Sequence, residues 1–323
     1  MIRAVLVTPP NVDERTIALL EAGGCRVIRP AKAESDIQPE EWPGLLAGAR
    51  GWIIGPHARV TRELVAAAPD CRVFIRRGVG RERLDMDAIR DLGRVGAIAA
   101  GGNEDSVADH AVGLMLAVAR RVREQQIAML AGDWSIRVSG DLFRKTVGIV
   151  GMGRTGRALA RRLAGFECRV LATTPRPDGA DGVEFVDLPT LLRQSDFVSL
   201  HAPLTPATRH MIDARALAAM KQGAILVNTG RGGLVDDAAL LTALRAGHPA
   251  GAGLDVFEAE SDHAARDTAM QLLALPNVVG TPHSAASTRE GLARTNEIAA
   301  RCVLAVLDGV EPPPGCVVVD GRR

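Results

Sequence analysis

The stretch KTVGIVGMGRTGR, Lys145–Arg157, decides how the chain is interpreted. Its apolar run Val147–Val150 predicts a buried strand, and the residues after Gly156 have the periodicity of a helix. The pattern between them suits a dinucleotide, because Gly151 permits a tight turn, Gly153 lets the backbone approach a pyrophosphate, and Gly156 lets helix and strand pack closely. The helix N-terminus offers N–H groups to the phosphates. With both flanks present, the pattern predicts a dinucleotide site, whereas the glycines alone would indicate only a structural turn.

Length and composition restrict the class of protein. A chain of 323 residues with 47% hydrophobic residues is long enough for two domains with sizeable cores. The formal charge of +1 and the lack of a membrane-length apolar run favour neither nucleic acid nor a membrane as partner. Five scattered cysteines and a short apolar N-terminal run lead us to expect a cytoplasmic protein without a disulfide framework or a metal site.

Strands and helices alternate along both parts of the chain. In the N-terminal part the predicted strands are Ala4–Val7, Cys25–Ile28, Trp52–Ile54, Arg72–Ile75 and Val95–Ala99, with helices at Glu14–Glu21, Thr61–Ala68 and Asp85–Leu92. From Val147 the predicted strands are Val147–Val150, Arg169–Thr173, Phe197–Leu200, Ala224–Val227, Gly251–Leu254 and Val278–Gly280, again with intervening helices. This alternation predicts an α/β fold of two domains with doubly wound parallel sheets, the second of the Rossmann type.

Two further helices and the tail complete the prediction. Asn103–Ala131 has a broad apolar face and is predicted as one long helix, in the core, in a dimer interface or, as we favour, linking two domains. A final helix, Thr288–Leu307, is long enough to return to the first domain. The Pro- and Gly-rich tail Val310–Arg323 is expected to be peripheral.

Several ordered segments resemble one family. NTGRGGLVDDAAL at Asn228–Leu240 is similar to its NxxRGxxVD signature, GLDVFEAE at Gly253–Glu260 to its LDVFxxE segment, and TPHSAAST at Thr281–Thr288 to its TPH stretch. The segments SLHAPLTPATRHMI and GGNEDSVADHAVGLMLA also match. These are marks of the D-isomer-specific 2-hydroxyacid dehydrogenases, the group with phosphoglycerate dehydrogenases and glyoxylate/hydroxypyruvate reductases, and the resemblance covers almost the whole chain.

The resemblance implies a domain plan. Residues 1–99 and 288–323 would form a flavodoxin-like substrate-binding domain, and residues 100–287 a Rossmann domain inserted into it, with the active site in the cleft. A homodimer is expected from the family and from the apolar helix after Asn103.

The resemblance also assigns the chemistry of 2-keto acid reduction to three residues. Arg231 would fork its guanidinium onto the substrate carboxylate and carbonyl oxygen. His283 would be the general acid in reduction and the general base in oxidation, because an imidazole has an unperturbed pKa of about 6.5. Glu260 would orient the ring and raise its pKa. Each residue alone has an ordinary explanation as a loop cation, a cap or a solvated acid, so the prediction depends on all three together with the motifs.

The segment FIRRGVGRERLD, Phe74–Asp85, resembles the family's substrate loop but departs from it. The resemblance implies that the amides of Val79 and Gly80 bind the substrate carboxylate. Arg77 lies where the family usually has a small residue, and Arg81–Arg83 replaces an apolar residue followed by Asp-Asn. The four arginines suit either recognition of a phosphate or second carboxylate, or a solvated turn. The candidate substrate-binding residues are Arg76, Arg77, Val79, Gly80, Asn103 and Arg231.

Cofactor choice depends on LATTPRPD, Leu171–Asp178, at the end of the second Rossmann strand. NAD-binding sites place an acid here on the ribose hydroxyls, but Thr173 or Thr174 takes its place and Arg176 follows, which suits a 2′-phosphate. Asp178 is the competing acid. We therefore expect NADP(H), with NAD(H) as the alternative. Further candidate cofactor-binding residues are Gly151, Gly153, Arg154, Thr155, Gly156, His201, Ala202, Pro203, Thr229 and Asp255, and for His201 a structural role is equally open.

The predicted function is an oxidoreductase that transfers a hydride between NADPH and a small 2-keto acid such as glyoxylate or hydroxypyruvate. One alternative is an NAD-dependent phosphoglycerate-type dehydrogenase. An alternative from another class is a dinucleotide-sensing protein, like the corepressors that share this fold, but the intact set of Arg231, Glu260 and His283 counts against it. The remaining histidines are interpreted as surface or packing residues: His57, His110, His210, His248 and His263.

Overall fold

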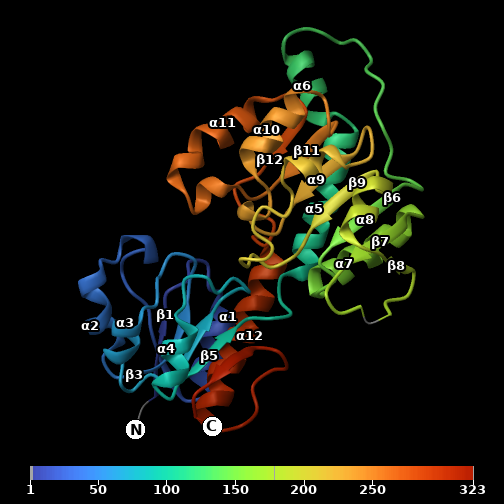
Figure 1. The fold of residues 1–323 in the computed structure, drawn as a ribbon. Coiled ribbons are helices and arrows are strands. Elements are labelled where there is room, and N and C mark those ends of the chain that lie inside the picture. Colours follow the sequence, from blue (N-terminus) through green and yellow to red (C-terminus); the bar gives the residue numbers. More distant parts are fainter. Residues whose placement is uncertain (1–2, 178, 323) are drawn as a thin grey trace. The chain divides into compact units, whose positions relative to one another are not determined.

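The computed structural model describes residues 3–177 and 179–322, and it divides into two compact units. Unit 1 comprises Met1–Asn103 and Thr288–Arg323, and unit 2 comprises Glu104–Ser287. Each unit contains one sheet with helices on both faces, coloured blue and red for unit 1 and green to orange for unit 2 (Figure 1). No helix among the described residues is both long and apolar enough to cross a membrane.

The sheet of unit 1 has the strand order β13-β5-β4-β3-β1-β2. Its parallel strands are β1 (Arg3–Val7), β2 (Cys25–Ile28), β3 (Ala49–Ile54), β4 (Val73–Arg76) and β5 (Val95–Ile98). Side chains alternate between two cores: Val5, Ile53 and Ile75 point to one face, and Leu6, Trp52 and Phe74 to the other. Such alternation fixes the register of each strand, because a shift by one residue would exchange the two faces.

The prediction of a peripheral tail is wrong. Residues Val317–Asp320 form β13, which pairs antiparallel with β5 and covers that edge of the sheet. Cys316 just before it is fully buried, and Val319 packs so closely on Gly96 that a Cβ at Gly96 would lie 2.7 Å from it. The prolines and glycines of the tail favoured a loop, although a run of valines lies among them. These valines form a strand because they pair with a segment distant in the sequence.

Most of the helices that the structure describes in unit 1 begin at side-chain caps. They are α1 (Glu14–Ala22), α2 (Trp42–Leu46), α3 (Arg62–Ala66), α4 (Met86–Asp91) and α12 (Arg289–Asp308). The side chains of Asp13, Thr61, Asp85 and Thr288 accept hydrogen bonds from the first turns of α1, α3, α4 and α12. The final helix α12 returns to unit 1 as predicted and buries Ala299, Ala300, Val303 and Val306 in the core beside β3 and β4.

The sheet of unit 2 is fully parallel, with the order β12-β11-β10-β9-β6-β7-β8. Its strands are β6 (Thr146–Val150), β7 (Arg169–Thr173), β8 (Val183–Phe185), β9 (Phe197–Leu200), β10 (Ile225–Asn228), β11 (Gly251–Leu254) and β12 (Val278–Gly280). Its helices after β6 are α7 (Arg154–Leu163), α8 (Leu188–Gln194), α9 (Ala214–Ala218), α10 (Asp237–Arg245) and α11 (Arg266–Ala274). The predicted fold class of two doubly wound α/β domains is confirmed, although β8 and α11 were not predicted. The strand order reverses between β6 and β9, and ligands of such sheets bind at this point.

The single long helix predicted after Asn103 is wrong. The structure has α5 (Glu104–Ala119) and α6 (Val122–Leu130), separated at Arg121, whose φ is 54°. Helix α5 is a core helix, since its buried face packs against α7, β10 and β11 within unit 2. Helix α6 and the segment after it extend away from the sheet of unit 2 (Figure 1). They expose an apolar set that we call the α6 arm: Val122, Ile127, Met129, Leu130, Trp134, Ile136, Val138 and Phe143.

Candidate active site

The predicted site residues of unit 2 lie at the carboxyl ends of its strands. Because parallel strands end at the same edge of a sheet, the fold brings these segments to one edge. In the order of the chain, they are Gly151 after β6, Thr173 at the end of β7, His201 after β9, Thr229 after β10, Asp255 after β11 and His283 after β12.

The glycine turn has the geometry that its sequence predicts. Gly151 has a φ of +99°, and a Cβ there would lie 2.7 Å from the backbone N of Ala202. A Cβ at Gly156 would lie 2.3 Å from the carbonyl oxygen of Gly151, so neither position accepts a side chain. A Cβ at Gly153 would meet nothing within 4 Å, which leaves open space at the N-terminus of α7, where Arg154 and Thr155 form the first turn. The turn therefore fits a pyrophosphate.

The residues expected to select the cofactor follow the end of β7. Thr173 is the last residue of that strand, and both it and Thr174 are half-buried. Arg176 is exposed, and Asp178, the competing acid, lies outside the described residues. Nothing in these contacts distinguishes NADPH from NADH, so the cofactor preference stays a prediction.

His201 is held by neighbours of its own sheet. Its Nε2 is 2.9 Å from Oγ of Ser199, and its Nδ1 is 3.4 Å from Oγ1 of Thr229. Burial lowers the pKa of His201 to about 4, so the ring is neutral at physiological pH. These bonds support the structural alternative, and the role of His201, Ala202, Pro203 and Thr229 in cofactor binding stays a prediction.

His283 and Glu260 form a hydrogen-bonded pair. His283 Nδ1 is 2.6 Å from Oε2 of Glu260, whose Oε1 accepts the N–H of Phe257 at 2.9 Å. The hydrogen bond to Glu260 raises the pKa of His283 above 6.5, although burial and the charge of Arg231 act in the opposite direction. The His283 side chain is 51% exposed, and Nε2 has no hydrogen-bond partner among the described residues. The geometry suits a proton donor that faces a small molecule.

The turn that presents His283 is organised by Asp255, which is 1% exposed. Its Oδ1 accepts from Oγ1 of Thr281 at 2.6 Å and from N–H of Ser284 at 2.8 Å, and its Oδ2 accepts from N–H of Ala285 at 3.0 Å. Its backbone carbonyl also accepts the N–H of His283 at 2.8 Å. Burial alone would raise the pKa of Asp255, but hydrogen bonds from His110, Thr281 and the turn amides outweigh it and lower the pKa to about 2.

These bonds give two residues roles that the sequence did not suggest. The expected role of Asp255 in cofactor binding stays a prediction, but its carboxylate already fixes the turn over which His283, with a φ of 52°, is held in the left-handed region. His110 was interpreted as a surface or packing residue, yet its Nε2 is 2.9 Å from Oγ1 of Thr281 and 3.5 Å from Oδ1 of Asp255. The sequence could have indicated this role, because His110 lies in the GGNEDSVADH segment that resembles the family.

Arg231 lies on the same edge, in the loop after β10. Its backbone is extended, its Nη1 donates to the carbonyl of Gly230 at 2.8 Å, and its own carbonyl accepts from Nδ2 of buried Asn228 at 2.9 Å. A Cβ at Gly232 would lie 2.1 Å from the backbone of Phe257, so the Arg231 loop and the Glu260 turn are in direct backbone contact. The structure therefore brings Arg231, Glu260 and His283 together within unit 2.

A group of buried charges behind these segments was missed by the sequence analysis. Asp237 and Glu258 exchange backbone–carboxylate hydrogen bonds of 3.0 and 3.3 Å, and His210 Nε2 is 2.5 Å from Oε1 of Glu258. Burial and the charge of Glu258 raise the pKa of Asp237 to about 7. Because these bonds join the Arg231 loop to the Glu260 turn, they stabilise the relative position of the two side chains. All three residues lie in segments that the sequence analysis quoted, but the contacts between them join positions far apart in the chain.

In unit 1, the arginines of the substrate loop have different environments. Arg76 donates to the carbonyl of Gly80 at 3.3 Å and to that of Gly55, while Arg77 donates to the carbonyl of Pro10. Burial, with a smaller effect of Arg76, lowers the pKa of Arg77 to about 10. Val79, Arg81 and Arg83 are exposed, and Asn103 is half-buried at the end of the segment after β5. Arg76 and Arg77 thus brace the loop, and only Arg81 and Arg83 are exposed as a solvated turn or an anion site requires.

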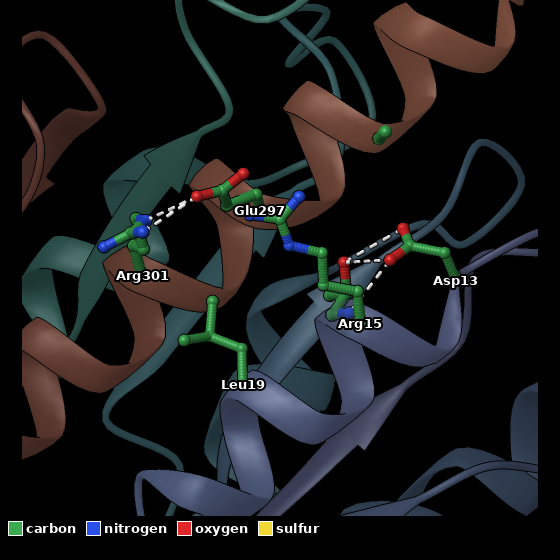
Figure 2. A pocket seen from close by; sticks show the side chains of 7 residues that line it. Asp13, Arg15, Leu19, Glu297 and Arg301 are labelled. Atoms are coloured by element: carbon green, nitrogen blue, oxygen red, sulfur yellow. Dashed lines mark hydrogen bonds and ion pairs between the residues drawn. The ribbon is translucent and has the colours of Figure 1, made fainter.

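Unit 1 also has a surface hollow of about 260 Å³ between α1 and α12 (Figure 2). It contains none of the predicted site residues, and its charged groups are largely paired: Glu297 with Arg301, and Asp13 with Thr16 and Asn296. Among the residues that the structure describes, no cluster of His, Cys, Asp or Glu is placed to hold a metal ion.

A Rossmann sheet with a glycine turn at its switch point, and a histidine–carboxylate pair at the same edge, define a nicotinamide-dependent oxidoreductase. The family model "D-isomer specific 2-hydroxyacid dehydrogenase, NAD binding domain" matches residues 112–285. A hydroxypyruvate reductase of Thermotoga maritima is 38% identical over 75% of this chain and 79% of its own length. A glyoxylate reductase of Thermococcus litoralis is 39% identical over 79% of this chain and 80% of its own length.

The structural comparison agrees. The TT0316 protein of Thermus thermophilus matches with a TM-score of 0.86 and 37% identity over 98% of this chain and 100% of its own. By contrast, this chain spans 50–58% of the length of the matched D-3-phosphoglycerate dehydrogenases. The chain belongs to the D-isomer-specific 2-hydroxyacid dehydrogenases, and it is an NAD(P)-dependent enzyme of that family.

Proposed function

We propose that the enzyme reduces a small 2-keto acid such as glyoxylate or hydroxypyruvate, with NADPH as the favoured cofactor. The observation that carries the proposal is the 2.6 Å pair of His283 and Glu260 beside Arg231, at the sheet edge that also holds the glycine turn. The names of the hydroxypyruvate and glyoxylate reductases that the chain resembles support this substrate class.

The chain's own residues account for binding and proton transfer. The nicotinamide cofactor, when bound, supplies the hydride to the carbonyl carbon. Arg231 binds the substrate carboxylate through its planar guanidinium. In unit 1, the amides of Val79 and Gly80 are the proposed donors to substrate. His283 holds a proton at Nε2 and donates it to the carbonyl oxygen, while Glu260 stabilises the imidazolium.

The preference for NADPH rests on the residues after β7. The described residues at the end of this strand are Thr173 and Thr174 rather than an acid, and exposed Arg176 follows. A hydroxyl and a guanidinium stabilise a 2′-phosphate, whereas a carboxylate would repel it. The NAD-dependent phosphoglycerate-type alternative is favoured by one observation, the exposure of Arg81 and Arg83 on the substrate loop.

We further propose that the enzyme is a homodimer and that the α6 arm forms the interface. Trp134 is 75% exposed and Ile136 is 97% exposed, and a monomer rarely exposes so many large apolar side chains in one segment. A second copy of the chain is the partner that the family resemblance implies. Sedimentation velocity would give a dimer for the parent and a monomer for a Trp134→Ser, Ile136→Ser double variant. A monomeric parent would contradict this part of the proposal.

Nicotinamide absorbance with purified protein tests the main proposal. NADPH and NADH are compared against glyoxylate, hydroxypyruvate, phosphorylated hydroxypyruvate, and larger aliphatic and aromatic 2-keto acids. Turnover that prefers NADPH and a small unphosphorylated acid is the expected result. Turnover with NADH alone would overturn the cofactor preference and leave the catalytic residues in place. Tight dinucleotide binding without turnover of any of these acids would favour the sensing alternative.

A further inference from the structure

Glu34 is a buried carboxylate of unit 1 that the sequence analysis did not single out. Its side chain is 4% exposed, although it lies between surface residues in a polar segment. Four donors converge on it. Oε1 accepts from Oγ1 of Thr8 at 2.6 Å and from N–H of Gly55 at 2.7 Å, and Oε2 accepts from N–H of His57 at 2.6 Å and of Ala58 at 3.2 Å.

The amides of Gly55, His57 and Ala58 form what we call the amide cradle, in the turn after β3. Successive backbone N–H groups that point to one spot make an anion-binding concavity. Glu34 fills it closely, since a Cβ at Gly55 would lie 2.6 Å from Oε2 of Glu34. Thr8, whose Oγ1 also accepts from Nε1 of Trp52 at 3.1 Å, closes the remaining side. The anion that occupies the amide cradle is therefore the Glu34 carboxylate of the chain itself.

The cradle lies beside the substrate loop. Strands β3 and β4 are neighbours, with Ile54 paired to Arg76, so the turn that starts at Gly55 and the loop that starts at Arg77 leave the sheet side by side. Arg76 joins them, because it donates to the carbonyls of Gly55 and Gly80. The charge of Glu34 also acts on Arg77, whose pKa it raises against the effect of burial.

We propose that Glu34 is a specificity-determining residue, whose carboxylate occupies the cradle that a second anionic group of a substrate would otherwise bind. This inference deepens the proposed function, on which it rests. Backbone N–H donors stabilise a phosphate or second carboxylate, and Glu34 both uses the donors of the cradle and repels a like charge. The enzyme then selects 2-keto acids whose far end carries no charge.

The first test is binding, which needs no turnover. In Glu34→Ala the cradle is vacated, so acetate, formate or inorganic phosphate should raise the thermal unfolding midpoint of this variant. The parent, in which Glu34 fills the cradle, should respond less. Glu40→Ala removes an exposed charge from the same segment and should behave like the parent. A Glu34→Ala protein whose midpoint responds to these anions no more than the parent would overturn the cradle's role. Because this readout is independent of catalysis, it separates a failure of the inference from a failure of the proposed function.

The second test is selectivity. The parent should favour hydroxypyruvate over its phosphorylated form by about tenfold or more in kcat/KM, and Glu34→Ala should lower that ratio by about tenfold. Should Glu34→Ala not fold, Glu34→Gln keeps the volume but loses the charge. It should lower the ratio without gaining stabilisation by added anions, because the cradle stays filled. A parent that uses both acids equally well, or a ratio unchanged in Glu34→Gln, would overturn the inference.

Discussion

The carboxyl edges of the two sheets use charged residues in opposite ways. In unit 1, three charged side chains at this edge bind backbone groups: Glu34 is buried against amides, and Arg76 and Arg77 donate to carbonyls. In unit 2, His283 and Glu260 are paired with each other but remain about half exposed. A charge that is satisfied by its own backbone shapes a surface, whereas a paired and exposed imidazole can exchange a proton. The contrast supports the proposals that proton transfer occurs in unit 2 and that Glu34 limits substrate choice from unit 1.

The largest expected effect is that of removing the proton donor. His283→Ala should lower kcat for reduction by about 10²–10⁴-fold, the usual contribution of a positioned general acid. Dinucleotide affinity, measured by fluorescence titration, should stay close to that of the parent, because the glycine turn is untouched. The exposed His263 provides the matched control, His263→Ala, which should retain parental activity. If His283→Ala kept the turnover of the parent, His283 would not be the proton donor.

The next effect is on stability and concerns the residue beneath His283. Asp255→Ala leaves the turn amides and Thr281 without their buried acceptor, so urea unfolding should show a loss of about 3 kcal/mol. Asp181→Ala, at an exposed loop position, should change stability little. If the two variants unfolded alike, the turn would not depend on Asp255.

The same residue predicts a pH dependence. The folded pKa of Asp255 is lowered to about 2, below the ordinary aspartate value of 3.8, so its contribution to stability is present above pH 4 and is lost as pH falls toward 2. Acid unfolding of the parent should therefore include this loss. Asp255→Asn should show a weaker dependence of stability on pH over the same interval.

Local patterns in the sequence explain how much of the molecule could be predicted. The strand before Gly151, the helices that begin beside Thr61 and Thr288, and the fold class follow from periodicity and turn chemistry over short stretches. The strand β13 and the break at Arg121 could not be predicted in this way. The first needs β5 as a distant partner, and the second has no Gly or Pro to mark it.

The site residues also differ in how far local patterns predict them. Arg231, Glu260 and His283 were found because each lies in a recognisable segment, and the structure joins them at one edge. Glu34 and the Asp237–Glu258 pair were missed, because their function arises from contacts between residues about twenty positions apart or more. From the sequence alone, a polar residue in a polar segment is predicted to be exposed to solvent, because the tertiary contacts that bury it cannot be seen there.

The smallest predicted effect concerns the cofactor. Arg176→Ala should reduce the preference for NADPH over NADH by about tenfold, because one charge-assisted hydrogen bond to the 2′-phosphate is lost. Arg193→Ala removes an exposed arginine from α8 of the same unit and should leave the preference unchanged. The ratio of kcat/KM for the two cofactors measures it. An unchanged ratio in Arg176→Ala would assign the preference to Thr173 or Thr174.

The pH profile of reduction, in the parent and in Glu260→Gln, tests the central claim most directly. Reduction needs protonated His283, so kcat/KM is high at low pH and falls as pH rises through the His283 pKa, which the hydrogen bond to Glu260 holds above 6.5. Replacing the carboxylate by an amide removes that stabilisation. The account predicts that this falling limb moves to lower pH in Glu260→Gln, while the dinucleotide affinity is kept. A limb at the same pH in both proteins would contradict the assignment of His283 and Glu260 as the acid pair.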